Sequence, residues 1–264
     1  MTVRTETDGA VLVVTIDRPE KRNAIDPATA EALRAAFAAF AADPALRVAV
    51  LTGVGGTFCS GFDLGAVAGA WPDPAGPGPM GPTRMEPDKP VLAAVEGHAV
   101  AGGLELALWC DLRIASETAV FGVFCRRWGV PLIDGGTVRL PRLIGQGRAL
   151  DMILTGRPVD AREAHAWGLA DRLVPAGAAL AEARALAEAI ARFPEACLRA
   201  DRRSALAQWG LPLAAALRAE AEGGLAPLRE EGKAGALRFL AGAGRHGRFD
   251  SDPPCAGPGP AGRS

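Results

Sequence analysis

The stretch VEGHAVAGGLELALWCD, residues 95–111, joins an apolar strand pattern to a turn of small residues that opens a helix. Free backbone N–H groups at a helix start, reinforced by the helix dipole, can receive an oxygen that becomes negative during a reaction. A side chain at Gly102 or Gly103 would hold a substrate carbonyl away from these donors. Glu105 follows about one helical turn later, where it can transfer a proton beside that carbonyl. The alternative is an ordinary buried strand, turn and helix in which Glu105 only favours the dipole.

A second apolar strand pattern also ends in a glycine-rich turn, in the stretch VAVLTGVGGTFCSGFDL, residues 48–64. Its glycines imitate the dinucleotide-binding pattern G-x-G-x-x-G, but Phe58 stands where the third glycine is required. The same Phe58 replaces the first glycine of a G-x-S-x-G nucleophile elbow around Ser60. A Rossmann fold and a serine hydrolase are therefore disfavoured.

These two stretches, together with RPEKRNAI at residues 18–25, resemble the crotonase superfamily, also called the enoyl-CoA hydratase/isomerase family. The resemblance continues in the family's order and spacing through residues 121–122, 129–140, 144–145, 154–170 and 247–249. It implies an α/β fold: a crotonase-like, right-handed spiral of ββα turns over residues 1–195, then a C-terminal helical region at residues 196–250 used in trimer assembly. The tail, residues 251–264, is rich in Pro and Gly and is expected to be disordered.

The resemblance assigns an oxyanion hole to the backbone N–H groups of Phe62 and Gly102, which follow the two strand patterns. In the family, their shared oxygen belongs to a coenzyme A thioester and the intermediate is an enolate. Stabilising charge on this oxygen acidifies the α carbon, and each well-aimed donor lowers the barrier by roughly 3 kcal/mol. Backbone donors tolerate a change of side chain, so we expect Phe62 to keep the function and to narrow the pocket.

Contacts to coenzyme A are expected near the first strand end and in the second glycine turn, from Lys21, Arg22, Asp63, Leu64 and Gly65. Lys21 and Arg22 suit phosphates or adenine, although basic residues at turns are usually solvated. Members of the family often carry a Lys near the position of Gly65, and this chain departs from them there.

The acid–base residues follow the family pattern only in part. Glu105 matches one of the two carboxylates of the hydratases, whereas the second falls on Cys125. A thiol with a pKa of about 8.5 is a poor substitute for a carboxylate. Asp134 is the nearest replacement acid, and its alternative role is to cap the next helix. We expect Cys125 and Trp128 to line the substrate pocket.

Two neighbouring arginines, Arg126 and Arg127, lie close to these acids in the sequence. They can lower the pKa of either acid or hold a substrate carboxylate. They can equally belong to a subunit interface.

Composition excludes several classes of protein. A chain of 264 residues with 49% hydrophobic residues can bury one large core, and a net charge of −1 gives no reason to expect nucleic acid or an anionic membrane as a partner. Five scattered cysteines without a C-x-x-C pair, and three histidines, predict no metal site and a reducing compartment. The first apolar run, residues 11–16, is too short for a signal sequence or a membrane span, so a cytoplasmic protein is expected.

The periodicity predicts strands at residues 11–16, 48–52, 91–95, 112–115 and 120–121, and helices at residues 26–42, 104–109 and 144–155. Asp26 and Pro27 are typical of an N-cap and the first helical position. Residues 68–90, crowded with Pro and Gly, predict a loop that is either a solvated excursion or a lid. Helical patterns dominate from residue 161 to about residue 240.

The leading hypothesis is an acyl-CoA-processing enzyme, an enoyl-CoA hydratase or dehydratase, that needs no cofactor or metal beyond the coenzyme A of its substrate. Double-bond isomerisation ranks lower because the carboxylate position used by isomerases is Cys125. Decarboxylation or other enolate chemistry with Asp134 is a further alternative, and so is an acyl-CoA-binding protein without activity. The resemblance implies a homotrimer or a dimer of trimers.

Overall fold

The computed structural model describes residues 2–69 and 72–244, and the chain divides into two compact units, Met1–Glu188 and Ala189–Ser264. The first unit is mixed α/β, and the described part of the second is helical. This order confirms the predicted α/β core followed by a helical region. The boundary after residue 195 stays a prediction, and the tail at residues 251–264 lies outside the described residues.

The large sheet of the first unit has the strand order β1-β2-β3-β4-β6-β9. Its strands are β1 (Val3–Asp8), β2 (Val11–Ile16), β3 (Val48–Gly53), β4 (Val91–Val95), β6 (Leu112–Ser116) and β9 (Arg172–Val174). β2 to β4 are apolar along nearly their whole length, as expected for parallel strands covered on both faces. β1 pairs antiparallel with β2 at the edge. The sequence analysis missed it because its side chains after Val3 are polar and exposed.

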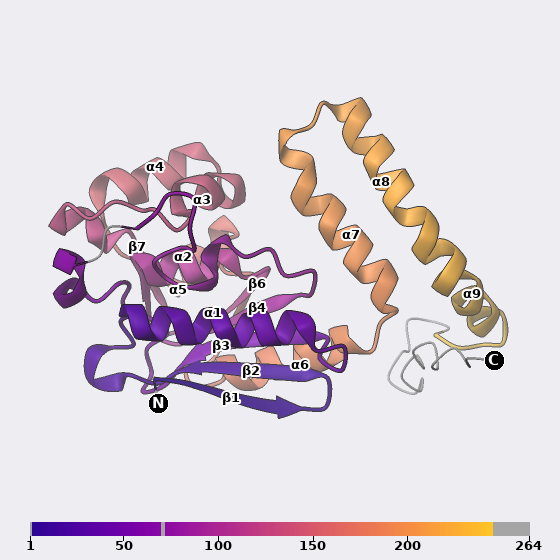
Figure 1. Cartoon of the computed structure of the whole chain (residues 1–264), viewed down its shortest axis with the longest axis horizontal. Coiled ribbons are helices and arrows are strands. Elements are labelled where there is room, and N and C mark those ends of the chain that lie inside the picture. Colours follow the sequence, from indigo (N-terminus) through magenta and orange to yellow (C-terminus); the bar gives the residue numbers. More distant parts are fainter. Residues whose placement is uncertain (1, 70–71, 245–264) are drawn as a thin grey trace. The chain divides into compact units, whose positions relative to one another are not determined.

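Helix α1 (Pro27–Ala42) packs along β1 and β2 (Figure 1). The Asp26 carboxylate accepts the Thr29 N–H at 2.8 Å, and Pro27 occupies the first helical position, which confirms the predicted start. At the other end the buried Lys89 donates to the carbonyls of Phe40 (2.9 Å) and Asp43 (2.6 Å). A cation on the last carbonyls of a helix stabilises its C-terminus.

A smaller sheet has the order β5-β7-β8, formed by His98–Val100, Val120–Gly122 and Val159–Asp160. Helix α2 (Gly102–Trp109) leaves the end of β5. Arg113, only 1% exposed on β6, donates to the carbonyls of Ala107 and Cys110 at the far end of α2 and pairs with Asp171 at 2.7 Å. The C-terminal end of α2 is thereby fixed.

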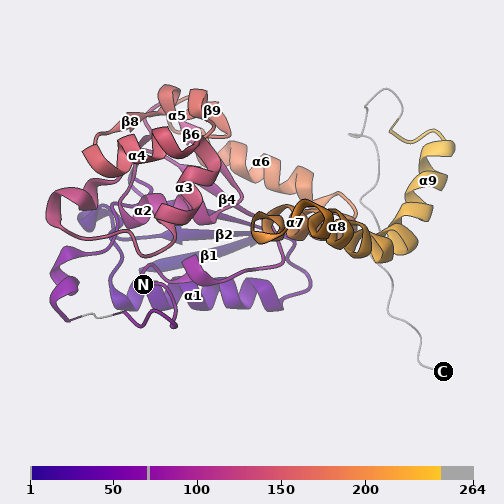
Figure 2. The ribbon, with the colours of Figure 1, turned by 90° about the horizontal axis from the view of Figure 1, so that it is seen from above.

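The helix predicted at residues 144–155 is confirmed as α4 (Gln146–Thr155). A separate helix, α3 (Gly136–Ile144), precedes it, and Gly145, with a φ of +81°, lies between the two. Helices α5 (Ala161–Trp167) and α6 (Ala179–Ala191) follow. Figure 2 shows α3 to α5 on the opposite side of β1 and β2 from α1. Over its described residues, 68–69 and 72–90, the predicted loop is confirmed apart from short 3-10 turns, Leu64–Gly69 and Pro82–Arg84.

The second unit contains α7 (Glu195–Ala207), α8 (Leu213–Pro227) and α9 (Lys233–Leu240). The Glu231 carboxylate, on the π-helical segment Leu228–Gly232 between α8 and α9, accepts the N–H groups of Ala196 (3.0 Å) and Cys197 (2.9 Å) at the start of α7. Large apolar side chains on this unit are exposed: Leu206, Trp209, Leu211, Leu213, Leu217, Leu225, Leu228, Leu237, Phe239 and Leu240. Within the described residues, none of the helices is both long and apolar enough to cross a bilayer.

Candidate active site

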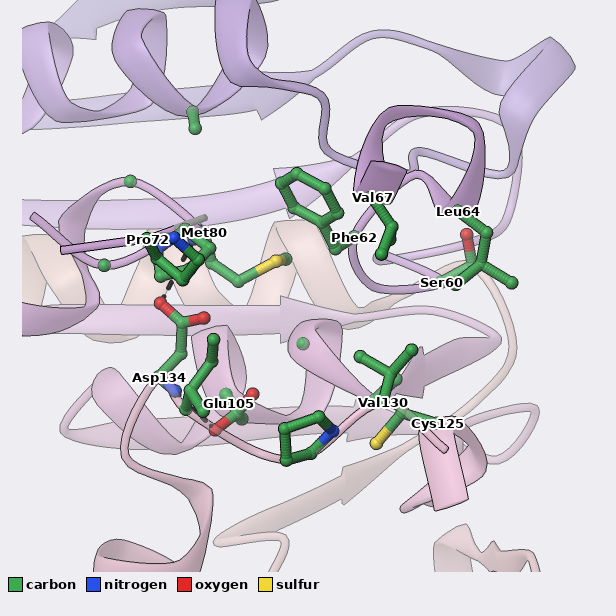
Figure 3. Close-up of a pocket in the computed structure, with 18 of the residues that line it drawn as sticks. Ser60, Phe62, Leu64, Val67, Pro72, Met80, Glu105, Cys125, Val130 and Asp134 are labelled. Atoms are coloured by element: carbon green, nitrogen blue, oxygen red, sulfur yellow. Dashed lines mark hydrogen bonds between the residues drawn. The ribbon is translucent and has the colours of Figure 1, made fainter. Parts of the chain in front are cut away.

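A cavity of about 1100 Å³ opens in the first unit, beside the start of α2 (Figure 3). Its walls come from the first turns of α1, residues 60–67, residues 72–81, the end of β5 with the start of α2, and residues 124–134. Most of the lining side chains are apolar, and Glu105 and Asp134 are the carboxylates deep in the wall. This combination is typical of a site that binds an apolar group and acts on it at one end.

The two segments that carry the expected backbone donors, Phe62 and Gly102, meet at the cavity. Gly61 O accepts the Ile25 N–H, and Asp63 N–H donates to Ile25 O, each at 2.8 Å. Because peptide groups alternate along an extended segment, the Phe62 N–H between them points away from Ile25. Gly102 is the first residue of α2, so its N–H has no acceptor within the helix. A Cβ on Gly61 would lie 3.1 Å from the Gly102 nitrogen, which shows that the two segments touch.

The turn that precedes α2 is strained. Ala101, its N-cap, has φ +53° and ψ −125°, a conformation that costs a non-glycine residue about 1–3 kcal/mol. Its N–H donates to Gly122 O on β7 at 2.8 Å, and this bond holds the turn in place. Strain of this kind persists only where surrounding contacts impose it, and it is common at functional sites.

Gly102 and Gly103, the two glycines of this turn, are required for different steric reasons. A Cβ on Gly102 would meet the Met80 side chain inside the cavity, in agreement with the expected obstruction of a substrate. A Cβ on Gly103 would instead collide with the main-chain carbonyl of Cys59. Gly103 therefore allows α2 to approach the neighbouring segment, and the expectation that it faces the substrate is wrong.

Glu105 lies in the wall of the cavity and is 3% exposed. One carboxylate oxygen, Oε1, accepts the N–H groups of Asp134 and Gly136, each at 2.8 Å. Burial raises the pKa of Glu105 to about 7, the Gly136 N–H opposes the rise, and the charge of Asp134 adds to it. A carboxyl with a pKa near neutrality can both accept and donate a proton under ordinary conditions.

Asp134 lies beside Glu105 and is also 3% exposed. Its Oδ1 accepts the Met80 N–H at 3.1 Å, drawn in Figure 3, and the Thr83 hydroxyl. Burial raises the pKa of Asp134, and these two hydrogen bonds oppose the rise. Gly135, not Asp134, is the N-cap of α3, so the helix-capping alternative is wrong.

Cys125, which the resemblance aligns with the second family carboxylate, lines the cavity and is 7% exposed. In Figure 3, Asp134 and Cys125 lie on opposite sides of Glu105. Burial raises the pKa of the Cys125 thiol, and the negative charge of Glu105 raises it further. The thiol therefore stays neutral beside Glu105. Trp128 also lines the cavity but is 69% exposed, so it belongs to the rim.

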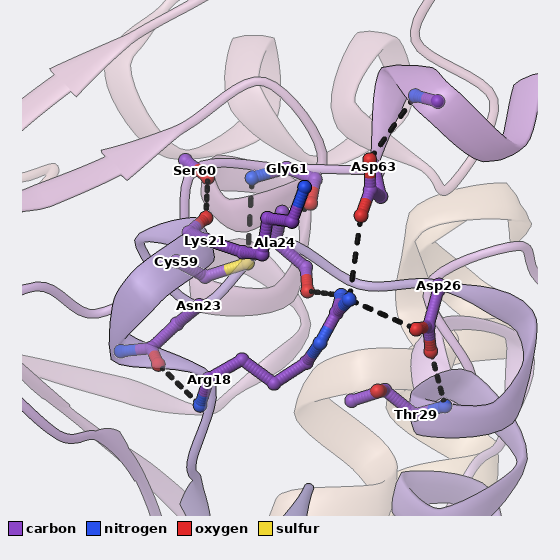
Figure 4. A network of polar contacts seen from close by, with 11 residues as sticks. Arg18, Lys21, Asn23, Ala24, Asp26, Thr29, Cys59, Ser60, Gly61 and Asp63 are labelled. Atoms are coloured by element: carbon purple, nitrogen blue, oxygen red, sulfur yellow. Dashed lines mark hydrogen bonds and ion pairs between the residues drawn. The ribbon is translucent and has the colours of Figure 1, made fainter.

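The residues expected to contact coenzyme A fall into two groups. Arg22 and Leu64 line the cavity, whereas Lys21, Asp63 and Gly65 lie outside its lining. Asp63 is turned inward: it pairs with Arg18 at 3.3 Å and accepts the Gly65 N–H at 3.1 Å (Figure 4).

Arg18 organises this region, and the sequence analysis gave it no role. It is 9% exposed, pairs with Asp26 at 3.0 Å as well as with Asp63, and donates to Ala24 O at 2.5 Å (Figure 4). It thereby joins the N-cap of α1 to the segment that carries Phe62. Buried Asn23 donates to the carbonyls of Val54 and Thr57 and holds the second glycine turn. The only indication in the sequence was that both belong to the stretch RPEKRNAI.

Arg126 and Arg127 do not face the acids. Arg126 donates to Ile153 O at 3.1 Å and Arg127 to Gly156 O at 2.9 Å, so both attach their turn to the end of α4. Arg139, on α3, is the cation that acts on both Glu105 and Asp134, and Arg84 acts on Asp134 as well. The sequence analysis missed Arg139 because it considered only the charges nearest to Cys125 along the chain.

The sequence profile of the enoyl-CoA hydratase/isomerase family matches residues 6–240. The chain is 39% identical over 207 residues to enoyl-CoA hydratase EchA19 of Mycobacterium tuberculosis, covering 75% of this chain and 78% of that protein. It is 43% identical over 191 residues to carnitinyl-CoA dehydratase of Proteus mirabilis, covering 70% and 72% of the two chains. The crystal structure of enoyl-CoA hydratase EchA1 from Mycobacterium marinum superposes with a TM-score of 0.86 and 36% identity, over 91% of this chain and 96% of that one. With the donors, the acids and the fold in place, these similarities establish that the chain belongs to the enoyl-CoA hydratase/isomerase family.

Proposed function

We propose that this protein is an acyl-CoA hydratase or dehydratase, which adds water to, or removes it from, the Cα–Cβ bond of an acyl-CoA thioester. The observation that carries the proposal is the placement of Glu105, with its pKa raised to about 7, in the same cavity as the free N–H groups of Phe62 and Gly102. The names of the similar proteins, a hydratase and a dehydratase, support the same reaction class.

The two N–H groups form the oxyanion hole of the proposed site. They bind the thioester oxygen and stabilise the enolate that develops on it, at roughly 3 kcal/mol of barrier for each donor. Because the donors belong to the main chain, the bulk of Phe62 does not remove them. The Phe62 ring instead limits the space beside the thioester.

Glu105 and Asp134 divide the proton transfers of the hydration: as neighbouring buried acids they share one proton, and the reactive form is the one in which Asp134 carries that proton and Glu105 is ionised. Ionised Glu105 takes a proton from water while the water oxygen bonds to Cβ, and the electrons of the double bond move through Cα to the thioester oxygen. Protonated Asp134 then gives its proton to Cα as the thioester carbonyl reforms. Transfer of a proton from Glu105 to Asp134 resets the pair, and dehydration runs through the same steps in reverse.

The test is the hydration of crotonyl-CoA, followed by the loss of ultraviolet absorbance of the conjugated thioester. Glu105→Gln keeps the size of the side chain and should lower kcat by about 10²–10⁴-fold. Glu31→Gln, which neutralises an exposed carboxylate at the edge of the same cavity, is the matched control and should leave the rate nearly unchanged. If the wild type and Glu105→Gln both show only background turnover while acyl-CoA binding is retained, the proposed enzymatic function is refuted and the protein is an acyl-CoA-binding protein.

We further propose that the protein works as a homotrimer or a dimer of trimers through residues 196–250. The exposed apolar side chains on α7 to α9 support an interface there. Lys21 and Arg22 are proposed to contact the phosphates or adenine of coenzyme A, and Arg22 is the better placed of the two because it lines the cavity. A cytoplasmic location is also proposed, since Cys59, Cys110, Cys125 and Cys197 are free thiols. Light scattering that gives a monomer mass would refute the assembly.

A further inference from the structure

Arg139 projects from the first turns of α3 and stands behind the cavity wall, outside the lining residues. One guanidinium nitrogen donates to the main-chain carbonyl of Asp134 at 2.9 Å. The other donates to the main-chain carbonyl of Thr83 at 2.8 Å. The rigid fork of an arginine can hold two acceptors at once, which a lysine ammonium cannot do with the same geometry.

These contacts close a ring of three residues. Arg139 binds Asp134 and Thr83 through their carbonyls, and the Thr83 hydroxyl in turn donates to the Asp134 carboxylate. The same turn also orients the second acid, because the N–H groups of Asp134 and Gly136 hold Glu105. One guanidinium therefore fixes the segment on which the positions of both acids depend.

The backbone leaves room for this guanidinium. Gly135 has φ +97°, and a Cβ there would collide with the Arg139 guanidinium. The turn between Asp134 and α3 is thus compatible with the ring only when residue 135 has no side chain.

We propose that Arg139 is a positioning residue of the hydration: it clamps the main-chain carbonyls of Asp134 and Thr83 and so sets the geometry of the Glu105–Asp134 pair. The inference rests on the proposed function, because it assigns the acids their proton transfers. Arg139 also supplies a positive charge near two buried acids, and this charge favours the state in which one of them is ionised.

The charged and titratable groups that face this cluster come from several elements. They are Glu105 from α2, Asp134 and Arg139 from the α3 turn and helix, Arg84 and Glu86 from residues 82–86, and Cys110 and Cys125. Burial raises the pKa of both thiols, so they stay neutral at working pH. The pH dependence expected of Arg139 variants therefore comes from the two acids.

The experiment compares Arg139→Met, Arg139→Lys and a control, Arg142→Met, which replaces an exposed arginine in the last turn of the same helix. Arg139→Met should lower kcat for crotonyl-CoA by about 10²-fold through misplacement of the acids, with KM changed less than about threefold. The acidic limb of its pH–rate profile should move upward by about one pH unit, because the loss of a nearby positive charge raises the pKa of Glu105. Arg139→Lys should lower kcat as well but leave the acidic limb near its wild-type position, and Arg142→Met should match the wild type.

Titration of the Glu105 carboxyl by carbon NMR gives a readout that does not need turnover. The pKa of Glu105 should rise in Arg139→Met and stay in place in Arg139→Lys. Unchanged kcat in Arg139→Met would overturn the inference, and so would a low kcat with an unmoved limb and an unmoved NMR titration. If wild type and Arg142→Met are both inactive, the proposed function has failed, and the NMR titration still decides the role of Arg139.

A second set of variants applies if Arg139→Met does not fold. Thr83→Val removes the hydroxyl that binds Asp134 but keeps the carbonyl that binds Arg139. If the ring acts as a unit, Thr83→Val and Arg139→Lys combined should lower kcat no further than the worse single variant. Additive losses would overturn the inference.

Discussion

The site has a donor half and an acid half, and the two use different chemical groups: the main chain in one and side chains in the other. The donor half uses main-chain N–H groups of Phe62 and Gly102, fixed by a bridge to Ile25 and by the start of α2. The acid half uses the side chains of Glu105 and Asp134, fixed by groups from distant segments. Main-chain donors survive a change of side chain, whereas acids can be exchanged or moved. In the proposed mechanism this difference lets the chain use the donor motif that the resemblance implies while it carries Cys125 at the position of one expected carboxylate.

Apart from the loss expected of Glu105→Gln, the largest effect is expected from a substitution in the donor half. In Gly102→Ala the new methyl meets the flexible Met80 side chain, which can shift, and both the methyl and the displaced Met80 take up space in the cavity beside the Gly102 N–H. We expect a fold that is kept and a kcat lowered by about 10²–10³-fold, the loss typical of one oxyanion donor. The hydration of crotonyl-CoA measures the loss of kcat, and thermal unfolding measures whether the fold is kept.

Two other glycines serve as controls for this variant. Gly147→Ala, on α4, meets no neighbouring atom within 4 Å and should leave both rate and stability nearly unchanged. Gly103→Ala should unfold the protein at a lower temperature, because its methyl collides with the Cys59 main chain. Full activity of Gly102→Ala would remove the donor half from the mechanism.

The acid half predicts a pH dependence of stability. The pKa of Glu105 is about 7 in the folded chain against an ordinary value of 4.5, so the folded state binds more protons between these values. The unfolding free energy is therefore highest below pH 4.5 as far as Glu105 contributes, and it falls as pH rises towards 7, by about 3 kcal/mol. Denaturant unfolding at several pH values, wild type minus Glu105→Gln, isolates this contribution. The same dependence of the unfolding free energy on pH in the wild type and in Glu105→Gln would contradict this prediction.

A smaller effect is expected from Asp134→Asn, which keeps the size of the side chain and removes its charge. We expect kcat to fall by about tenfold to a hundredfold, since one of the two proton transfers loses its acid. The acidic limb should move to lower pH, because the charge of Asp134 raises the pKa of Glu105. This direction is opposite to that of Arg139→Met. An upward shift in the pH–rate profile would show that the two acids are not coupled as described.

The smallest effect should come from Cys125→Ser. The thiol is neutral beside Glu105 and has no proton transfer in the proposed reaction, so kcat should stay within about threefold of wild type. A hundredfold loss in the same assay would instead make Cys125 the second acid and would return the chain to the family arrangement of two flanking groups.

Sequence reasoning captured the local features well. The Asp26–Pro27 helix start, the apolar strands β2 to β4 and the spacing of Gly102 and Glu105 all depend on neighbours within one or two turns of chain. It missed β1, whose outward charges hide the strand pattern, and it gave no bounds for α3. The identity of both elements depends on what packs against them.

By itself the sequence determined which residues can carry the chemistry: two glycine turns after buried strands, one carboxylate a turn into α2, and a second acid in place of the usual one. The tertiary structure decided how they work. It turned Asp134 towards Met80, 54 residues earlier in the chain, and brought its N–H to Glu105, 29 residues earlier. It also placed Arg139 behind the pair and buried the Glu105 carboxyl, which raised its pKa to about 7. The physical reason is that burial and electrostatic coupling depend on distance in space, and only the folded chain sets that distance.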